Sequence, residues 1–115
     1  NMATITGTGG SDILTFQGTL QQYTETLVNP YSGQSFSIDE IKRVNTGLYD
    51  GLAGNDFLFM SAVGDVIKLN DGNGNATLIN VEQIIAGDGG DIIFLADANL
   101  SLGNITISGG NSDDI

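Results

Sequence analysis

The sequence contains no cysteine and no histidine, and these two absences exclude several kinds of chemistry. No disulfide can form, and a zinc site made of thiolate or imidazole ligands is excluded. A nucleophile activated in a Ser-His or Cys-His pair is excluded as well.

Basic residues are also scarce. Three Lys and Arg residues stand against 14 Asp and Glu, which gives a net charge of −11. Such a surface repels nucleic acid and anionic lipid, so we expect neither as a partner, and we expect cations to stabilise the chain. No apolar run of about 18 residues is present, so no membrane span is predicted. Residues 1–5 show neither the charged nor the apolar region of a cleavable signal peptide.

Glycine and aspartate, in contrast, are abundant and occur together. The 115 residues include 17 glycines, and 11 of the 14 acidic residues are aspartate, which suits turns and short-reach oxygen coordination. Four glycine-rich stretches each lead into an aspartate that is followed by apolar residues: 7–14, 51–58, 86–93 and 109–115. A fifth, weaker copy at residues 71–78 has Ala76 in place of the aspartate, and we interpret it as structural.

Short segments rich in β-branched residues separate these turns: 65–69, 76–79, 81–85, 91–95 and 104–107. Adjacent apolar positions, rather than strict alternation, favour strands of a flattened solenoid over an open antiparallel sheet. Apolar residues make up 40% of the sequence, which is enough for a folded core, and 115 residues fit one domain. The strand-like segments predict that this domain is all-β. The predicted architecture is a parallel β-roll or β-helix-like solenoid with an irregular capping insertion.

Residues 17–49 interrupt the repeats and contain the only proline, Pro30. The capping-box spacing over 37–40 predicts a short helix, and a strand over 40–45 fits about as well. Because an open solenoid end exposes core and strand edges, we expect the insertion to cap one end of the stack. The predicted organisation is a first turn and strand at 1–16, the insertion or cap at 17–49, and irregular repeats at 50–115.

A glycine turn that ends in aspartate has the chemistry of part of a calcium site. Ca²⁺ takes six to eight oxygen ligands at about 2.3–2.6 Å, including carboxylates and backbone carbonyls. Glycine lets carbonyl groups approach because no Cβ is in the way. One turn supplies only part of the ligands, so two turns must stack, and this couples metal binding to folding.

The four stretches match most positions of the nonapeptide G-G-x-G-x-D-x-U-x, in which U is apolar, and the chain therefore resembles the RTX family of hemolysin-type calcium-binding repeats. The resemblance implies a parallel β-roll with Ca²⁺ in its turns, in a secreted or surface-bound bacterial protein exported by type I secretion. It further implies a structural module that folds or is stabilised on binding Ca²⁺. Its partners would be calcium ions and the rest of a larger polypeptide.

The metal ligands that the resemblance implies are carboxylates and carbonyls of the turns: Asp12, Gly51, Ala53, Asp56, Asp88, Asp91, Gly109, Asp113 and Asp114. The spacing favours a pairing of Asp91 with Asp113 or Asp114. Asp56 with Asp91 is the second choice, and Asp12 is the aspartate most expected to lack a partner. Glycines of the motif are replaced at four positions, namely Thr8, Leu52, Ala86 and Ser112.

Other functions use different residues. An adhesive or carbohydrate-binding module, attached to a glycan or a cell surface, would use the aromatic residues Tyr23, Tyr31, Phe36 and Tyr49. A polysaccharide-modifying enzyme needs a base and cationic groups, and only Lys42, Arg43 and Lys68 are present, so we do not expect this chain to be an enzyme. The spacing of residues 71–82 imitates an EF-hand, but Ala76 stands where that loop requires glycine, and both flanks predict strands.

Overall fold

The computed structural model describes residues 3–69, 76–94, 106–110 and 115, and all of their regular structure is β. In chain order the strands are β1 (Ala3–Thr6), β2 (Ile13–Thr15), β3 (Gly18–Val28), β4 (Ser35–Asn45), β5 (Gly47–Asp50), β6 (Phe57–Phe59), β7 (Asp65–Lys68), β8 (Leu78–Ile79), β9 (Gln83–Ile85), β10 (Ile92–Phe94) and β11 (Thr106–Ser108). The all-β prediction is confirmed for these residues. None of them lies in a helix long and apolar enough to cross a membrane.

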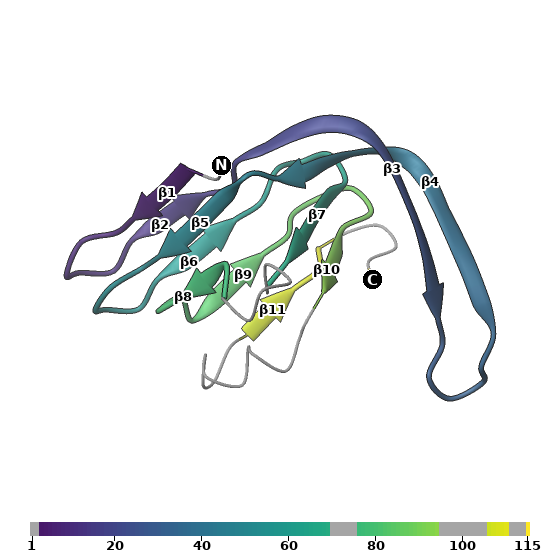
Figure 1. The fold of residues 1–115 in the computed structure, drawn as a ribbon. Helices are drawn as coiled ribbons and strands as arrows, with labels where there is room; N and C mark the ends of the chain where they lie inside the picture. The colour runs from purple at the N-terminus through teal and green to yellow at the C-terminus, as the bar shows by residue number, and fades with distance from the viewer. Residues whose placement is uncertain (1–2, 70–75, 95–105, 111–114) are drawn as a thin grey trace.

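The strands form three sheets that the chain enters in turn (Figure 1). Sheet A has the order β1-β5-β8, sheet B the order β2-β6-β9-β11, and sheet C the order β3-β4-β7-β10. Strands that are neighbours in a sheet run parallel, except for the antiparallel pair β3 and β4. Parallel neighbours require a long connection between them, and here the other two sheets provide most of that connection.

The circuits through the sheets differ in length: the first, from Asp12 to Asp56, takes 44 residues because it includes β3 and β4, and the next is shorter. The starts of β6 and β9 are marked by Asp56 and Glu82, which are 26 residues apart. The interval between Asp65 and Asp91, at the starts of β7 and β10, is also 26 residues. Ile115 continues sheet C beside β10, because its N–H donates to the backbone carbonyl of Asp91 at 2.8 Å.

Apolar side chains from all three sheets form the main core. Its buried members are Leu14, Phe16, Tyr49, Leu58, Met60, Ile67, Leu69, Leu78, Val81, Ile84 and Ala86. Successive side chains of a strand point to opposite faces. In β7, Ile67 therefore enters this core while Val66 packs with Ile38 and Ile92 in a second, smaller cluster on the other face of sheet C.

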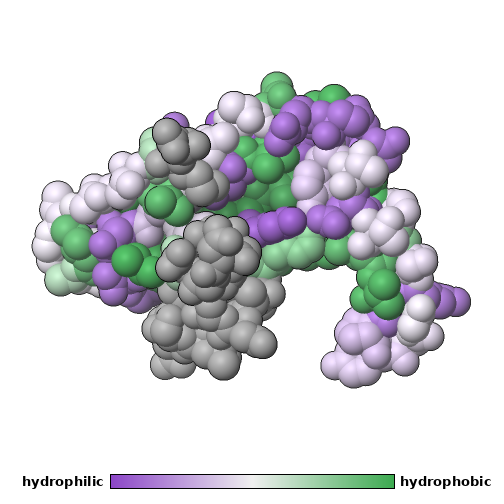
Figure 2. All heavy atoms as spheres, in the orientation of Figure 1, coloured by the Kyte–Doolittle hydropathy of each residue, from purple (hydrophilic) through white to green (hydrophobic). Residues whose placement is uncertain are grey.

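The predicted insertion forms a long β-hairpin, the arm, made of β3 and β4. Each strand has 11 residues, and Figure 1 shows the arm curving away from the other strands. Figure 2 shows the tip of the arm projecting away from the other described residues. Tyr23 and Leu27 on the inner face of the arm pack against the second cluster. This cluster therefore holds the arm against β7 and β10.

The structure decides several alternatives in this region. The helix suggested by residues 37–40 is absent and the strand is present, because β4 pairs with β3 along its whole length. Residues 47–49, which we assigned to the insertion, belong to β5, which lies in sheet A between β1 and β8. The arm curves away from β1 and β2 (Figure 1), and the capping role expected of the insertion stays a prediction. Strands, not helices, flank residues 71–82, as we expected when we rejected an EF-hand there, since β7 precedes this segment and β9 follows it.

The predicted strands after residue 64 agree with β7 to β10 to within a few residues. The last predicted strand, 104–107, lies partly outside the described residues, and β11 begins at Thr106. The pairing partners of these strands did not follow from the pattern, because they depend on the length of each circuit.

Candidate functional site

Acidic side chains stand above one another where the strands of sheet B begin. The N–H of Asp12 donates to Oδ1 of Asp56 at 2.7 Å. The N–H of Asp56 in turn donates to Oε1 of Glu82 at 2.6 Å. Each carboxylate therefore binds the backbone of the acidic residue one circuit earlier. We call Asp12, Asp56 and Glu82 the first carboxylate column.

A second carboxylate column, Asp65 and Asp91, lies at the start of β7 and β10 in sheet C. The N–H of Asp65 donates to Oδ1 of Asp91 at 2.9 Å, and both residues are fully buried. The structure places Asp56 and Asp91, the second-choice pair, in different columns. Asp12 was expected to lack a partner, and instead it is stacked on Asp56.

Two of these aspartates are also bound by a hydroxyl residue four positions earlier. The N–H of Thr8 donates to Oδ2 of Asp12 at 2.7 Å, and its hydroxyl lies 3.1 Å from Oδ1. The N–H and hydroxyl of Ser61 donate to Asp65 at 2.8 and 2.7 Å. In these two turns, hydrogen bonds from the chain itself bind the carboxylate that ends the turn.

Asp56 lacks this local closure. The residue four positions earlier is Leu52, which has no hydroxyl, and its N–H donates to Asp50 instead, at 3.0 Å. Leu52 also has a φ of 59°, so its peptide groups point in other directions than those of Thr8 and Ser61, which do not have a positive φ. As a result Oδ2 of Asp56 is buried and has no hydrogen-bond partner among the described residues.

Oδ2 of Asp56 lies close to Gly51 and to the backbone carbonyl of Asn80. A Cβ on Gly51 would lie 2.7 Å from Oδ2 of Asp56 and would collide with the backbone carbonyl of Asn80. No side chain can therefore occupy this position. Asn80 has a φ of 55°, and its side-chain amide donates to Oδ1 of Asp50 at 2.8 Å, which holds this turn against the preceding one.

These groups fit a calcium ion in chemistry, although they supply only part of its coordination. A buried carboxylate oxygen and a backbone carbonyl are hard oxygen ligands of the kind that Ca²⁺ takes, and water supplies further ligands in many such sites. Within the described residues, no group of three or more carboxylates is gathered closely enough to hold a metal. Any ion here would therefore be held by Asp56, carbonyl groups and water.

The other predicted ligands differ in how far they are exposed to solvent. Gly51 is buried, whereas Ala53 and Asp88 are exposed and Gly109 is half-buried. Asp113 and Asp114 lie outside the described residues, so their pairing with Asp91 stays a prediction.

Sequence reasoning missed Asp65 and Glu82, which belong to the two columns, and Asn80, whose carbonyl lies near Asp56. The spacing Ser61 to Asp65 repeats that of Thr8 to Asp12, and this signal could have identified the first of them. Glu82 carries no such signal, because no glycine-rich turn precedes it.

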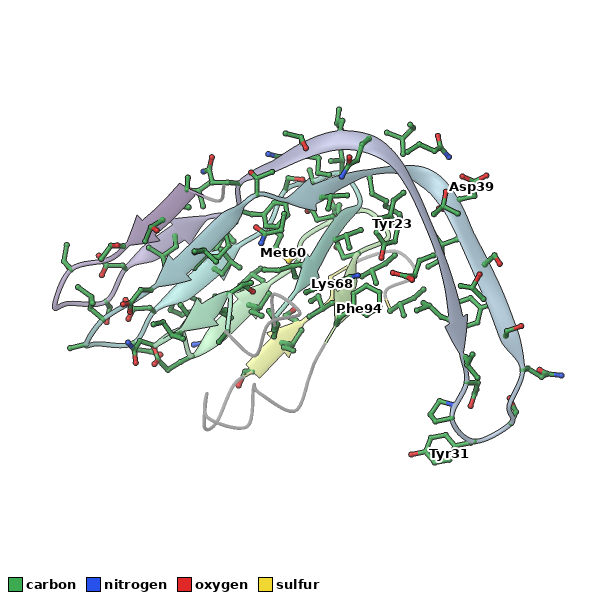
Figure 3. All side chains as sticks on the ribbon, in the orientation of Figure 1. Tyr23, Tyr31, Asp39, Met60, Lys68 and Phe94 are labelled. Atoms are coloured by element: carbon green, nitrogen blue, oxygen red, sulfur yellow. The ribbon has the colours of Figure 1, made fainter. Side chains whose placement is uncertain are left out.

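The aromatic residues proposed for an adhesive surface do not share one. Tyr49 is 2% exposed and its hydroxyl donates to Asn45 at 2.7 Å, so it belongs to the core. Burial raises the pKa of Tyr49 to about 12. Tyr31 is 98% exposed at the tip of the arm, far from Tyr23 beneath the arm (Figure 3). Burial also raises the pKa of Tyr23, which donates to Glu25 at 2.8 Å.

All three basic residues lie in strands of sheet C, and each is engaged. Lys42 is buried and its Nζ donates to the carbonyl of Gly90 at 2.5 Å. Arg43 lies over the ring of Phe16 at 5.5 Å. Lys68 lies 3.5 Å from Glu25, and its contact with Phe94 is visible in Figure 3. The hydrogen bond from Tyr23 and the nearby Lys68 lower the pKa of Glu25.

Comparison with models of known protein families, with curated proteins and with solved structures finds no match to this chain. The resemblance to RTX repeats rests on the glycine and aspartate pattern alone. Function must therefore be argued from the geometry of the turns.

Proposed function

We propose that this chain is a structural module, a parallel β-solenoid that Ca²⁺ stabilises through its acidic turns. The repeated passage through sheets A, B and C supports the solenoid. The stacking of acidic residues on the backbone of the previous circuit supports a structural role for the turns. The nonapeptide pattern supports membership of a secreted or cell-surface bacterial protein, of which this chain would be one part.

Asp56 is the observation on which the calcium assignment depends. A buried carboxylate oxygen without a partner is costly, and a cation beside it removes that cost. The oxygen lies beside Gly51 and near the carbonyl of Asn80, a second oxygen ligand of the kind that Ca²⁺ takes. An ion bound here would connect the turn before β6 with the turn before β9. Calcium would thus hold two successive circuits together in the folded state and would have no such site in the unfolded chain.

The experiment compares thermal unfolding in millimolar Ca²⁺ and in EDTA, for the chain and for Asp56→Asn. At a calcium concentration of about 100 times Kd, binding adds about 2.7 kcal/mol to the free energy of unfolding, which raises Tm by about 10 °C. Asp56→Asn keeps the acceptor for the Asp12 N–H but loses the charge, so its Tm is expected to be nearly independent of Ca²⁺.

Asp39→Asn is the matched control. It removes the same charge from an exposed position on the outer side of the arm (Figure 3), and it is expected to keep the full calcium response. Equal melting temperatures in Ca²⁺ and EDTA for the unmodified chain would contradict the proposal. An unchanged response in Asp56→Asn would place the ion elsewhere.

A further inference from the structure

The outer edge of β3 is a long edge strand without a neighbour. β3 ends the strand order of sheet C, and among the described residues only β4 pairs with it. It is 11 residues long, whereas the strands at the other sheet edges have two to four residues. Edge strands of this length are sites where another chain can add a strand.

The hydrogen bonds at the two ends of the hairpin show which backbone groups face outward. The N–H of Thr46 donates to the carbonyl of Gln17, and that of Asn29 donates to the carbonyl of Gln34. Antiparallel strands alternate between residues whose peptide groups face the partner and residues whose groups face away. Gln17 and Asn29 are both odd-numbered, so the odd-numbered residues of β3 face β4. The even-numbered residues Leu20, Gln22, Thr24, Thr26 and Val28 present their N–H and C=O groups at the free edge.

This edge lacks the features that usually protect an exposed strand. Residues 18–28 contain no proline and no lysine, and their only charged residue is Glu25, which lies 3.5 Å from Lys68. Leu20 and Val28 are 64% and 61% exposed. Charged side chains, proline or a bulge would normally block pairing here. In a chain with a net charge of −11, β3 carries a single acidic residue, so two copies repel each other little along this strand.

We propose that the free edge of β3 pairs with the β3 edge of a second copy of this chain, antiparallel and about a two-fold axis. With the axis at Tyr23, the middle of β3, the outward-facing residues meet each other. Gln22 then faces Thr24 of the other copy, and Leu20 faces Thr26. Glu25 faces Gln21, so no like charges stand opposite each other, which the cross-strand pairs of a stable sheet require.

The self-complementarity of this register favours a second copy over an unrelated strand. A two-fold interface must match each residue with its counterpart in reverse order. In this register all 11 residues of β3 have a partner, no two charged residues face each other, and the two sheets C become one continuous sheet. The tip of the arm projects away from the other described residues (Figure 2). The pairing makes no use of Asp56 or of Ca²⁺, so it stands or falls separately from the proposed function.

Sedimentation equilibrium in EDTA, at low and at high NaCl, tests the pairing. We expect a monomer–dimer equilibrium that salt strengthens, because salt screens the repulsion between the acidic copies. Thr24→Pro removes an outward N–H while leaving the β3–β4 ladder intact, since proline is tolerated at edge positions of this kind. Because the two-fold axis doubles the loss, dimerisation should weaken at least about tenfold. Tyr31→Ser, at the tip, is the matched control and should dimerise normally.

Cross-linking gives a second, independent measurement, because the chain has no cysteine of its own. Tyr23→Cys places two thiols opposite each other at the axis and should form a disulfide-linked dimer on mild oxidation. Thr19→Cys lies opposite Leu27 of the other copy, so its thiols are far apart and should not cross-link. A chain that stays monomeric at high salt, or a dimer that Thr24→Pro leaves unchanged, would overturn the proposal.

Discussion

At the scale of single residues, carboxylates act as backbone ligands inside this protein. Asp56, Asp65 and Asp91 are fully buried, and Asp56 and Asp91 each accept the N–H of an acidic residue from the previous circuit. A hydrogen bond to a charged group contributes about 1.5–3 kcal/mol, and a lost partner leaves a buried charge. The short aspartate side chain suits this role because it holds its oxygens close to the backbone.

Tyr49 provides a prediction about pH at this scale. Burial is the main reason that its pKa rises from 10.0 to about 12 in the folded chain. A raised pKa means that the folded state favours the neutral phenol. This contribution to stability is complete below pH 10 and is lost as the pH rises through about 12. The urea midpoint should therefore fall across this range, and the fall should be smaller in Tyr49→Phe. An identical fall in both proteins would show that other groups are responsible.

At the scale of elements, the glycine turns set how closely one circuit can lie on the next. Gly54 has a φ of 98°, and a Cβ on it would lie 2.5 Å from the carbonyl of Gly10 in the turn before. Gly9, in that neighbouring turn, would meet nothing within 4 Å. Two glycines of adjacent turns therefore have different roles, although both belong to the same sequence pattern.

The prediction for these turns compares Gly54→Ala with Gly9→Ala. The first combines an unfavourable φ with a collision against backbone, and it should lower the free energy of unfolding by about 2–4 kcal/mol. The second should change it by less than about 1 kcal/mol, with stabilisation possible through the unfolded state. Denaturant unfolding of both variants measures the difference, and equal losses would argue against close stacking of the two turns.

At the scale of the whole molecule, the net charge of −11 opposes the compact state. Acidic residues are spread over the turns and the arm, and only three basic residues balance them. Lys42 and Lys68 lie within 4.0 Å of a glutamate oxygen. The repulsion that remains acts over distances that salt screens.

We expect NaCl to raise Tm by several degrees between about 0.05 and 1 M, because the Debye length falls from more than about 10 Å to about 3 Å. This effect should be the same in Asp56→Asn, since screening does not depend on one site. The comparison separates a general response to salt from specific binding of Ca²⁺. A Tm that falls with NaCl would show that attractive ion pairs outweigh the repulsion.

The sequence alone determined the strand-rich class, the positions of the turns and the residues that bend and close them. Glycine, aspartate and β-branched residues act through local conformational preference, so their pattern is visible without a structure. The partners of Asp12, Asp56 and Asp91 were decided only by the tertiary structure. A parallel sheet joins residues that are 26 or 44 positions apart, and the path of the whole circuit sets that distance. The strand at 35–45 was settled in the same way, because its ladder with β3 overrides the local helix signal.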